Sequence, residues 1–216
     1  MRSLDITVLC TSAEHPVNVM LRRWIETNSA VHSIKLCRSK TELGEGDVLF
    51  LISCSEIIGE DVRRRFSKVL VLHASDLPKG RGWSPHIWEV IAGAETIVLS
   101  LLEAKDKVDS GDIWKKLDVP IPRDALFHEI NEAIFLAEEK LLDYAVKNFD
   151  IIVPTPQSDD DVATYYSRRV PENSRIDPER TIAEQFDLLR VCDAERFPAF
   201  FEFRGARYKI MLEKIK

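Results

Sequence analysis

Short apolar runs alternate with amphipathic segments in the first part of the chain. Four runs rich in apolar and β-branched residues have the pattern of buried strands. They lie at 6–10, 33–37, 47–53 and 68–73. Two segments between them, at about 16–26 and 56–66, read as helices on their apolar spacing. This order predicts an α/β fold with a doubly wound, mostly parallel sheet and helices on both faces.

The pattern continues with further helices and strands and then changes after residue 150. A helix is expected at 85–93, strands at 95–103 and 113–121 around a polar loop at 106–112, and a long amphipathic helix at 123–148. Residues 151–161, with two prolines and the acidic run Asp159, Asp160 and Asp161, read as a linker. A helix at 181–190 and a hairpin of 199–204 with 207–212 follow. We therefore expect a catalytic domain over 1–150 and a small extension over 151–216.

Composition narrows the class of protein. Of 216 residues, 45% are hydrophobic and 31% are charged, which is the balance of a soluble globular chain. No apolar run approaches the roughly 20 residues of a membrane span, and the N-terminus lacks a signal-peptide layout, so a cytoplasmic protein is expected. The net charge of −6 argues against a nucleic-acid partner. The four cysteines form no CxxC pair, which favours buried thiols over a metal site.

Two polar stretches follow predicted strands, where ligands bind in such sheets. His73 leaves a buried strand and enters a loop rich in glycine and proline. An imidazole there can stabilise a developing negative charge or relay a proton, or can simply bond the backbone. Asp109 and Asp112 flank a Ser-Gly turn in the second stretch, which suits either a group that orients the imidazole or an ordinary hairpin turn.

Together the two stretches resemble the signature of the folate-dependent formyltransferases. That pattern is Asn-x-His-x-Ser-x-Leu-Pro, two residues, Arg-Gly, and later Leu/Val-Asp-x-Gly-Asp. The first motif is matched by His73, Ser75, Leu77, Pro78, Arg81 and Gly82, and the second by Val108, Asp109, Gly111 and Asp112. His73 and Asp109 are 36 positions apart, close to the family's interval. So many matches at fixed offsets are a specific signal.

The resemblance covers residues 45–210 and is greatest to one subgroup of the family. Residues 164–169 and 186–190 look like the stretch after the catalytic domain in methionyl-tRNA and sugar formyltransferases. The run at 73–85 looks most like short bacterial amino-sugar N-formyltransferases of the pseudaminic-acid type. The resemblance implies a Rossmann-like fold and formyl transfer from 10-formyltetrahydrofolate to an amino sugar, nucleotide-linked, in surface-glycan biosynthesis. It implies no metal and no membrane partner.

The resemblance also assigns site residues. His73 and Asp109 are the expected catalytic pair. The expected folate-binding residues are Ser53, Cys54, Ile57, Ile58, Asp106, Lys107 and Val108. The expected acceptor-binding residues are Thr11, Ser12, Ser75, Lys79, Arg81 and Trp83. Arg81 suits either a phosphate of the acceptor or the support of its own loop.

One departure leaves alternatives open. The family's asparagine, which helps to hold the formyl oxygen, is Val71 here. Another group takes over that role, or the chain is a folate-binding homologue with weak or lost catalysis; a formyltetrahydrofolate hydrolase is the third reading. A transfer-RNA acceptor is disfavoured because that enzyme normally carries a full C-terminal β-barrel and a basic surface. The apolar residues of the hairpin, which include Phe200 and Phe203, suit burial against the long helix or a homodimer partner.

Overall fold

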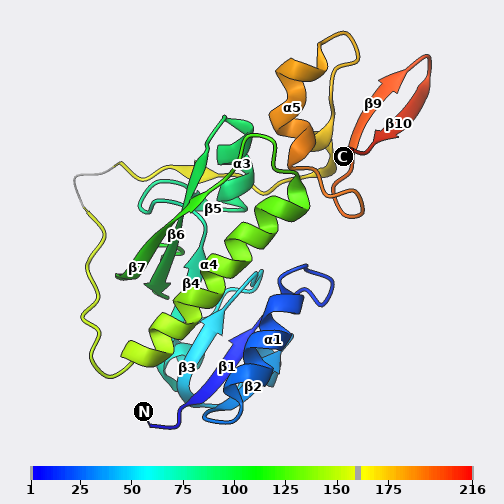
Figure 1. Ribbon diagram of the computed structural model, residues 1–216. Coiled ribbons are helices and arrows are strands. Elements are labelled where there is room, and N and C mark those ends of the chain that lie inside the picture. Colours follow the sequence, from blue (N-terminus) through cyan, green and yellow to red (C-terminus); the bar gives the residue numbers. More distant parts are fainter. Residues whose placement is uncertain (1, 159–161, 216) are drawn as a thin grey trace.

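A computed structural model describes residues 2–158 and 162–215, so the acidic run predicted in the linker lies outside the described residues (Figure 1). The centre is a six-stranded mixed sheet in the order β2-β1-β3-β4-β6-β7. The first four strands are parallel, and β6 and β7 are antiparallel to their neighbours. The strands are β1 (Asp5–Leu9), β2 (Ser33–Cys37), β3 (Gly46–Leu51), β4 (Phe66–His73), β6 (Thr96–Glu103) and β7 (Ile113–Pro120). The predicted α/β sheet is confirmed.

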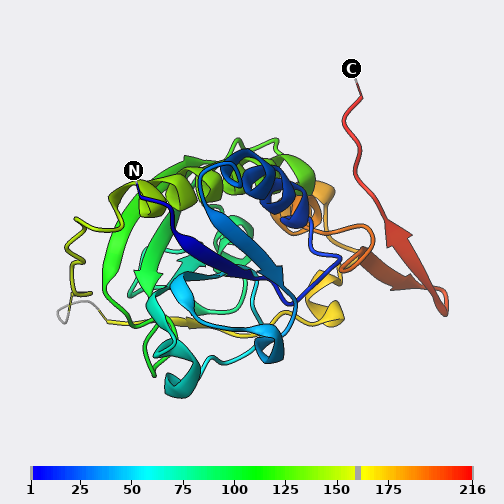
Figure 2. The ribbon, with the colours of Figure 1, turned by 90° about the horizontal axis from the view of Figure 1, so that it is seen from below.

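Helices cover the two faces of this sheet unequally. The long helix α4 (Phe127–Asn148) and α1 (Asn18–Asn28) lie over one face (Figure 2), and α3 (Pro85–Ile91) packs into the same core. The other face carries only the short α2 (Glu60–Arg63) and the 3-10 turn η1 (Lys40–Glu42). The sheet is therefore thickly covered on one side and thinly on the side where His73 points.

The sheet has an apolar core on each face: a first core under α1 and α4, and a second core beside α2. Strand β3 contributes side chains to both cores. Its side chains alternate in direction, so Phe50 enters the core under α1 and α4 while Leu49 enters the second core beside α2. A strand buried on both faces must be apolar at successive positions, as this one is. The predicted stripe of α4 is confirmed as well, because Ile130, Ile134 and Leu141 are each at most 2% exposed.

The predicted helix at 56–66 is wrong in extent, since α2 spans only Glu60–Arg63. Residues 53–59 form a loop instead, and Arg63 Nη1 donates to the Ile58 carbonyl at 2.7 Å. Phe66 already belongs to β4 and is buried in the second core. The helix predicted from the spacing of apolar residues is therefore shortened, because Phe66 is buried as part of β4 and residues 53–59 form a loop.

The extension folds as a small unit beside the N-terminal end of α4 (Figure 1). It contains β8 (Tyr165–Tyr166), η2 (Pro171–Ser174), α5 (Ile182–Arg190), β9 (Ala199–Phe203) and β10 (Ala206–Ile210). Ile176, Leu189 and Ala199 form one buried apolar cluster of the extension, so the hairpin packs on α5 within it. Phe200 is buried and Phe203 is 41% exposed. No helix among the described residues is long and apolar enough to cross a membrane.

Candidate active site

His73 and Asp109 meet at one edge of the sheet. His73 is the last residue of β4, and Asp109 lies in the loop of residues 104–112 between β6 and β7. His73 Nδ1 is 3.6 Å from Asp109 Oδ1, and both side chains are less than 10% exposed. The convergence that the two motifs predicted is therefore present in the structure.

The second ring nitrogen of His73 fixes the orientation of the imidazole. His73 Nε2 lies 2.8 Å from the carbonyl oxygen of Gly80. A carbonyl only accepts hydrogen bonds, so Nε2 carries the donated proton. The Nδ1–Asp109 distance exceeds a normal hydrogen bond, and no described residue bonds Nδ1 more closely. Nδ1 is thus the nitrogen that remains available to a reacting group.

Backbone contacts hold Asp109 in place. Its Oδ2 accepts a hydrogen bond from the amide of Gly82 at 3.0 Å, and its backbone sits at a positive φ of 55°. The turn passes against β6 so closely that a Cβ on Gly111 would lie 1.7 Å from the Glu103 carbonyl oxygen. Only glycine fits there, which gives the glycine of the second motif a steric reason.

The extension closes over the His73 loop through a contact that the sequence did not reveal. β5 (Arg81–Gly82) pairs in parallel with β8. Thr164 Oγ1 accepts from the Gly80 amide at 2.8 Å and Thr164 O from the Arg81 amide at 2.9 Å. A Cβ on Gly82 would lie 2.4 Å from the Tyr166 carbonyl oxygen, so the two backbones touch. Residues 164–166, which follow the predicted linker, thus support the loop whose Gly80 carbonyl orients His73.

Arg81 belongs to this internal support. Its side chain is buried, with Nη2 donating to Gln157 Oε1 at 2.6 Å and Nη1 to the Tyr165 hydroxyl at 3.3 Å. Gln157 Nε2 in turn donates to the carbonyls of Asp109 and Gly111, both at 2.9 Å. These contacts agree with the loop-supporting alternative for Arg81. Its contact with an acceptor phosphate stays a prediction.

The residues predicted to bind folate lie on two loops that Arg63 joins. Its guanidinium bonds the Ile58 carbonyl and pairs with Asp106 across to the 104–112 loop. Ile57 and Val108 are 73% and 56% exposed, which places apolar side chains on the surface of both loops. Ile58 itself is buried in the second core, and Lys107 is exposed.

Cys54 and Val71 pack against the second apolar core. Both are half-buried and pack with Ala104 on the second core. Burial raises the pKa of the Cys54 thiol, which therefore stays protonated at neutral pH. The family's asparagine position thus lies in an apolar setting, where a valine packs without leaving a polar group unpaired.

The residues predicted to bind the acceptor divide into two groups. Thr11 Oγ1 accepts from the Ser55 amide at 3.0 Å, and the Ser12 carbonyl accepts from Asn18 Nδ2 at 2.9 Å, so these residues tie loops together. Lys79 is exposed, and Trp83 is 41% exposed with the Arg168 guanidinium 4.9 Å from its ring centre.

Ser75 is fully buried, and its hydroxyl has no hydrogen-bond partner among the described residues.

Two grooves of the surface lie away from His73. One, of about 280 Å³, runs between α1 and α4, and one of about 170 Å³ is lined by Arg63, Lys68 and Glu103. Neither includes His73 or Asp109, so the polar contacts define the candidate site. In residues 2–158 and 162–215, no group of three His, Cys, Asp or Glu side chains is placed to hold a metal ion.

Solved structures share this fold. A methionyl-tRNA formyltransferase from Clostridium thermocellum aligns with a TM-score of 0.82 at 22% identity, covering 99% of this chain and 94% of that one. The structure of HypX from Aquifex aeolicus in complex with tetrahydrofolic acid gives 0.77 at 18%, covering 97% and 37%. A sugar N-formyltransferase from a Shewanella species gives 0.72 at 15%, covering 99% of both chains. At these identities the likeness establishes the fold.

Sequence comparisons identify the family. The methionyl-tRNA formyltransferase of Rickettsia bellii is 29% identical over 61% of this chain and 43% of its own length. The chain thus spans under half the length of the curated relatives that it matches. The model of the formyl transferase family matches residues 8–146, a range that contains both His73 and Asp109. This chain therefore belongs to the formyl transferase family.

Proposed function

We propose that the chain is an N-formyltransferase that moves a formyl group from 10-formyltetrahydrofolate to the amine of a nucleotide-linked amino sugar. The observation that carries the proposal is the His73–Asp109 pair at the end of β4, with Nδ1 facing the carboxylate at 3.6 Å. An imidazole and a carboxylate side by side can exchange protons with a reacting amine. The family match places this pair within a formyl transferase domain.

The loops beside the pair fit a folate. Exposed Ile57 and Val108 offer apolar contact to a flat ring, and the half-buried Cys54, Val71 and Ala104 form an apolar floor. The backbone groups of 53–58 and 106–108 would supply hydrogen bonds. When bound, 10-formyltetrahydrofolate supplies the formyl group and leaves as tetrahydrofolate. The tetrahydrofolic acid in the HypX structure supports a folate in this fold.

His73 and Asp109 would have different roles in the reaction. The attacking amine must be neutral, and it loses a proton as its nitrogen bonds to the formyl carbon. Asp109, fixed by the Gly82 amide, would accept that proton directly or through a water, and would return it to the folate nitrogen as the bond between that nitrogen and the formyl carbon breaks. His73, protonated on Nδ1, would donate to the oxygen that gains negative charge.

Two observations support an amino sugar as the acceptor. A sugar N-formyltransferase shares the fold over 99% of both chains, and the exposed Trp83 offers a ring for stacking on a sugar or base. The curated relatives are methionyl-tRNA formyltransferases, which makes transfer RNA the competing acceptor. The overall charge of −6 favours a small acceptor over a nucleic acid. Bacterial surface-glycan biosynthesis is the proposed setting.

A turnover assay tests these assignments. Purified protein with 10-formyltetrahydrofolate is expected to release tetrahydrofolate when a 4-amino-sugar nucleotide is added, and not with methionyl-tRNA. Release without any amine would identify a hydrolase instead. Folate binding without turnover across an amine panel would favour the second candidate, a homologue that lost catalysis, for which Val71 in its apolar setting is the motivating observation.

A further inference from the structure

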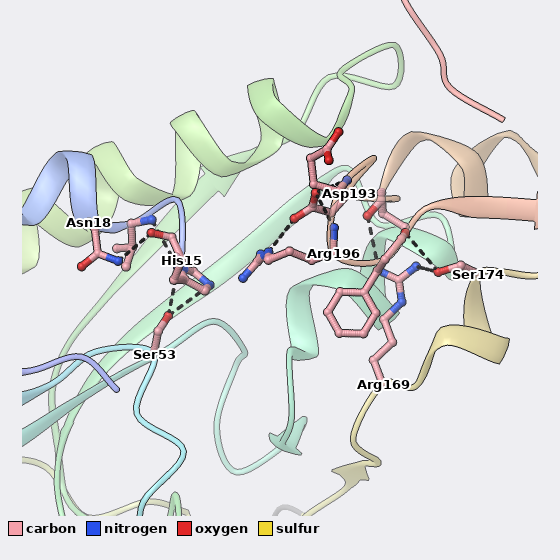
Figure 3. A network of polar contacts seen from close by, with 11 residues as sticks. His15, Asn18, Ser53, Arg169, Ser174, Asp193 and Arg196 are labelled. Carbon is pink, nitrogen blue, oxygen red and sulfur yellow. Dashed lines mark hydrogen bonds and ion pairs between the residues drawn. The ribbon is translucent and has the colours of Figure 1, made fainter. Parts of the chain in front are cut away.

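A second polar cluster lies at the carboxyl ends of β1 and β3 (Figure 3). His15 belongs to the loop after β1, and the Ser53 hydroxyl approaches both of its ring nitrogens, at 3.4 and 3.3 Å. Asn18 Nδ2 donates to the His15 carbonyl at 2.8 Å and so fixes the loop. The ring of Phe135 on α4 packs edge-on against the imidazole, with centroids 6.1 Å apart. His15 is thus held by the sheet domain.

The extension presents an arginine to this histidine. A turn at 193–197 is closed by Asp193, whose Oδ1 accepts from the amides of Glu195 and Arg196 and whose Oδ2 accepts from Arg196 Nε at 2.6 Å. Figure 3 shows the Arg196 side chain extending from this turn toward His15. Burial, then the charge of Arg196, lower the pKa of His15 to about 4, while Asp193 opposes them. The groups are therefore within electrostatic range, and His15 is neutral at pH 7.

The buried Arg169 contacts the turn that carries Arg196. Arg169 is 8% exposed, and its guanidinium donates to Ser174 Oγ at 2.8 Å and to the Val191 carbonyl at 3.4 Å. The same group lies 5.5 Å from the ring centre of Phe197. The turn that carries Arg196 is therefore held on two sides by the body of the extension.

Some polar atoms of this cluster have no hydrogen-bond partner among the described residues. Among the described residues, no partner is found for the two Nη atoms of Arg196 or for the buried Nδ1 of His86 on α3. Burial, followed by the charges of His15, His73 and Arg169, lowers the pKa of His86 to about 3. His86 thus lies within electrostatic range of both His15 and the candidate catalytic His73. The guanidiniums of Arg169 and Arg196 lie in this cluster with the carboxylate of Asp193. The carboxylate of Glu195 in the same turn is 87% exposed and lies 3.9 Å from Lys209 Nζ, so the charge balance of the cluster favours an anion.

We propose that Arg196 and His15 form a phosphoryl-binding subsite for the acceptor at the carboxyl ends of β1 and β3. The inference rests on the proposed function and names the part of the acceptor that this cluster would hold. A guanidinium with two free Nη groups matches two phosphoryl oxygens. The Val17 amide donates to His15 Nδ1 at 3.2 Å, so the neutral imidazole carries its N–H donor on Nε2, beside the Ser53 hydroxyl. Because Arg196 comes from the extension, the extension selects the acceptor while the sheet domain performs the transfer.

Calorimetric titration of the whole chain with UDP, uridine and inorganic pyrophosphate tests the subsite. UDP and pyrophosphate are expected to bind, and uridine to bind at least about 10-fold more weakly than UDP, since a charge-assisted hydrogen bond commonly contributes a factor of about 10 to 100. Arg196→Ala should weaken UDP and pyrophosphate by at least about 10-fold, and Arg196→Lys by less. Equal binding of UDP and uridine, or unchanged UDP affinity in Arg196→Ala, overturns the proposal, as does the absence of binding by all three probes.

Matched variants separate the subsite from folding and from catalysis. Arg204→Ala removes the same charge at the exposed tip of the hairpin and should leave UDP binding unchanged. Thermal melting of Arg196→Ala and Arg196→Lys checks that the turn around Asp193 survives. His73→Ala should bind UDP normally. Formyl transfer to a simple amine without UDP binding would refute the subsite alone, whereas UDP binding without any transfer would refute the proposed function alone.

Discussion

The sheet domain and the extension are stabilised in different ways, yet both supply the candidate site. The sheet is surrounded by two apolar cores that fill both faces, whereas the buried apolar cluster of the extension consists of Ile176, Leu189 and Ala199. The sheet contributes His73 and Asp109 from the ends of its strands. The extension contributes polar side chains, Gln157 and Arg196 among them, that reach back to those ends.

The difference separates stability from positioning. Burial of apolar area dominates the free energy of unfolding, so the sheet domain sets the stability of the protein. Single polar contacts contribute about 1 kcal/mol each, yet they decide where a reacting group sits. Variants of the extension residues that bond groups at the site should therefore change turnover more than thermal stability, and variants of buried residues in either part the reverse.

The largest effect is expected for the pair at the end of β4. His73→Ala and Asp109→Asn should each lower kcat by about 10²–10⁴-fold, because a general acid or base and a charge-stabilising donor act in the transition state. Steady-state release of tetrahydrofolate measures this. Circular dichroism should show an intact fold. Wild-type turnover in either variant would remove that residue from the mechanism.

Gln157→Ala tests whether the extension positions Asp109. Loss of its bonds to the Asp109 and Gly111 carbonyls should lower kcat by about 10-fold with little change in KM for folate. Gln185→Ala is the matched control, because Gln185 is a buried glutamine that also bonds backbone groups, but within the extension at α5. That control should lower the melting temperature without lowering kcat. An equal loss of kcat in both variants would indicate only a structural role.

Glu138→Gln tests how the core sets stability. Burial on α4 raises the pKa of Glu138 to about 8, well above the ordinary 4.5, and its Oε2 has no partner among the described residues. The folded state keeps the proton that the unfolded state loses. Stability present below pH 4.5 therefore falls as pH rises toward 8, by at most about 1.4 kcal/mol per pH unit.

Denaturant unfolding at pH 5.5 and 8.5 measures this difference. The variant should lose less stability than the wild type between the two pH values. Glu132→Gln, an exposed glutamate of the same helix, should behave like the wild type. A wild-type stability that does not fall with pH would show that Glu138 is not held protonated.

The smallest effect is expected for Val71→Asn. The variant restores the family's amide beside Cys54 and Ala104, next to the pair, and should raise kcat several-fold by adding a donor for the formyl oxygen. Single-turnover kinetics would measure the rate of formyl transfer directly. An unchanged or lower rate would show that another group already fills the position and that the amide disturbs the apolar floor.

The sequence by itself determined the strands of the sheet, the stripe of α4 and the identity of the two candidate catalytic residues. Period-two and period-3.6 patterns arise from local geometry, so Ile130 and Leu141 could be placed in the core from spacing alone. His73 and Asp109 could be paired because a fixed motif implies a fixed fold. The helix at 56–66 failed because tertiary burial of Phe66 outweighed local spacing.

Only the tertiary structure decided what surrounds that pair. The β5–β8 contact joins residues more than 80 positions apart through two backbone pairs, which leave no periodic trace in a sequence. From the sequence, Arg81 could face either a ligand or the interior of the protein. In the structure its guanidinium points inward and donates to Gln157. The side chain of Arg196 points toward His15 because the extension folds back toward the ends of β1 and β3. Contacts between single polar side chains depend on the path of the whole chain, so local patterns do not encode them.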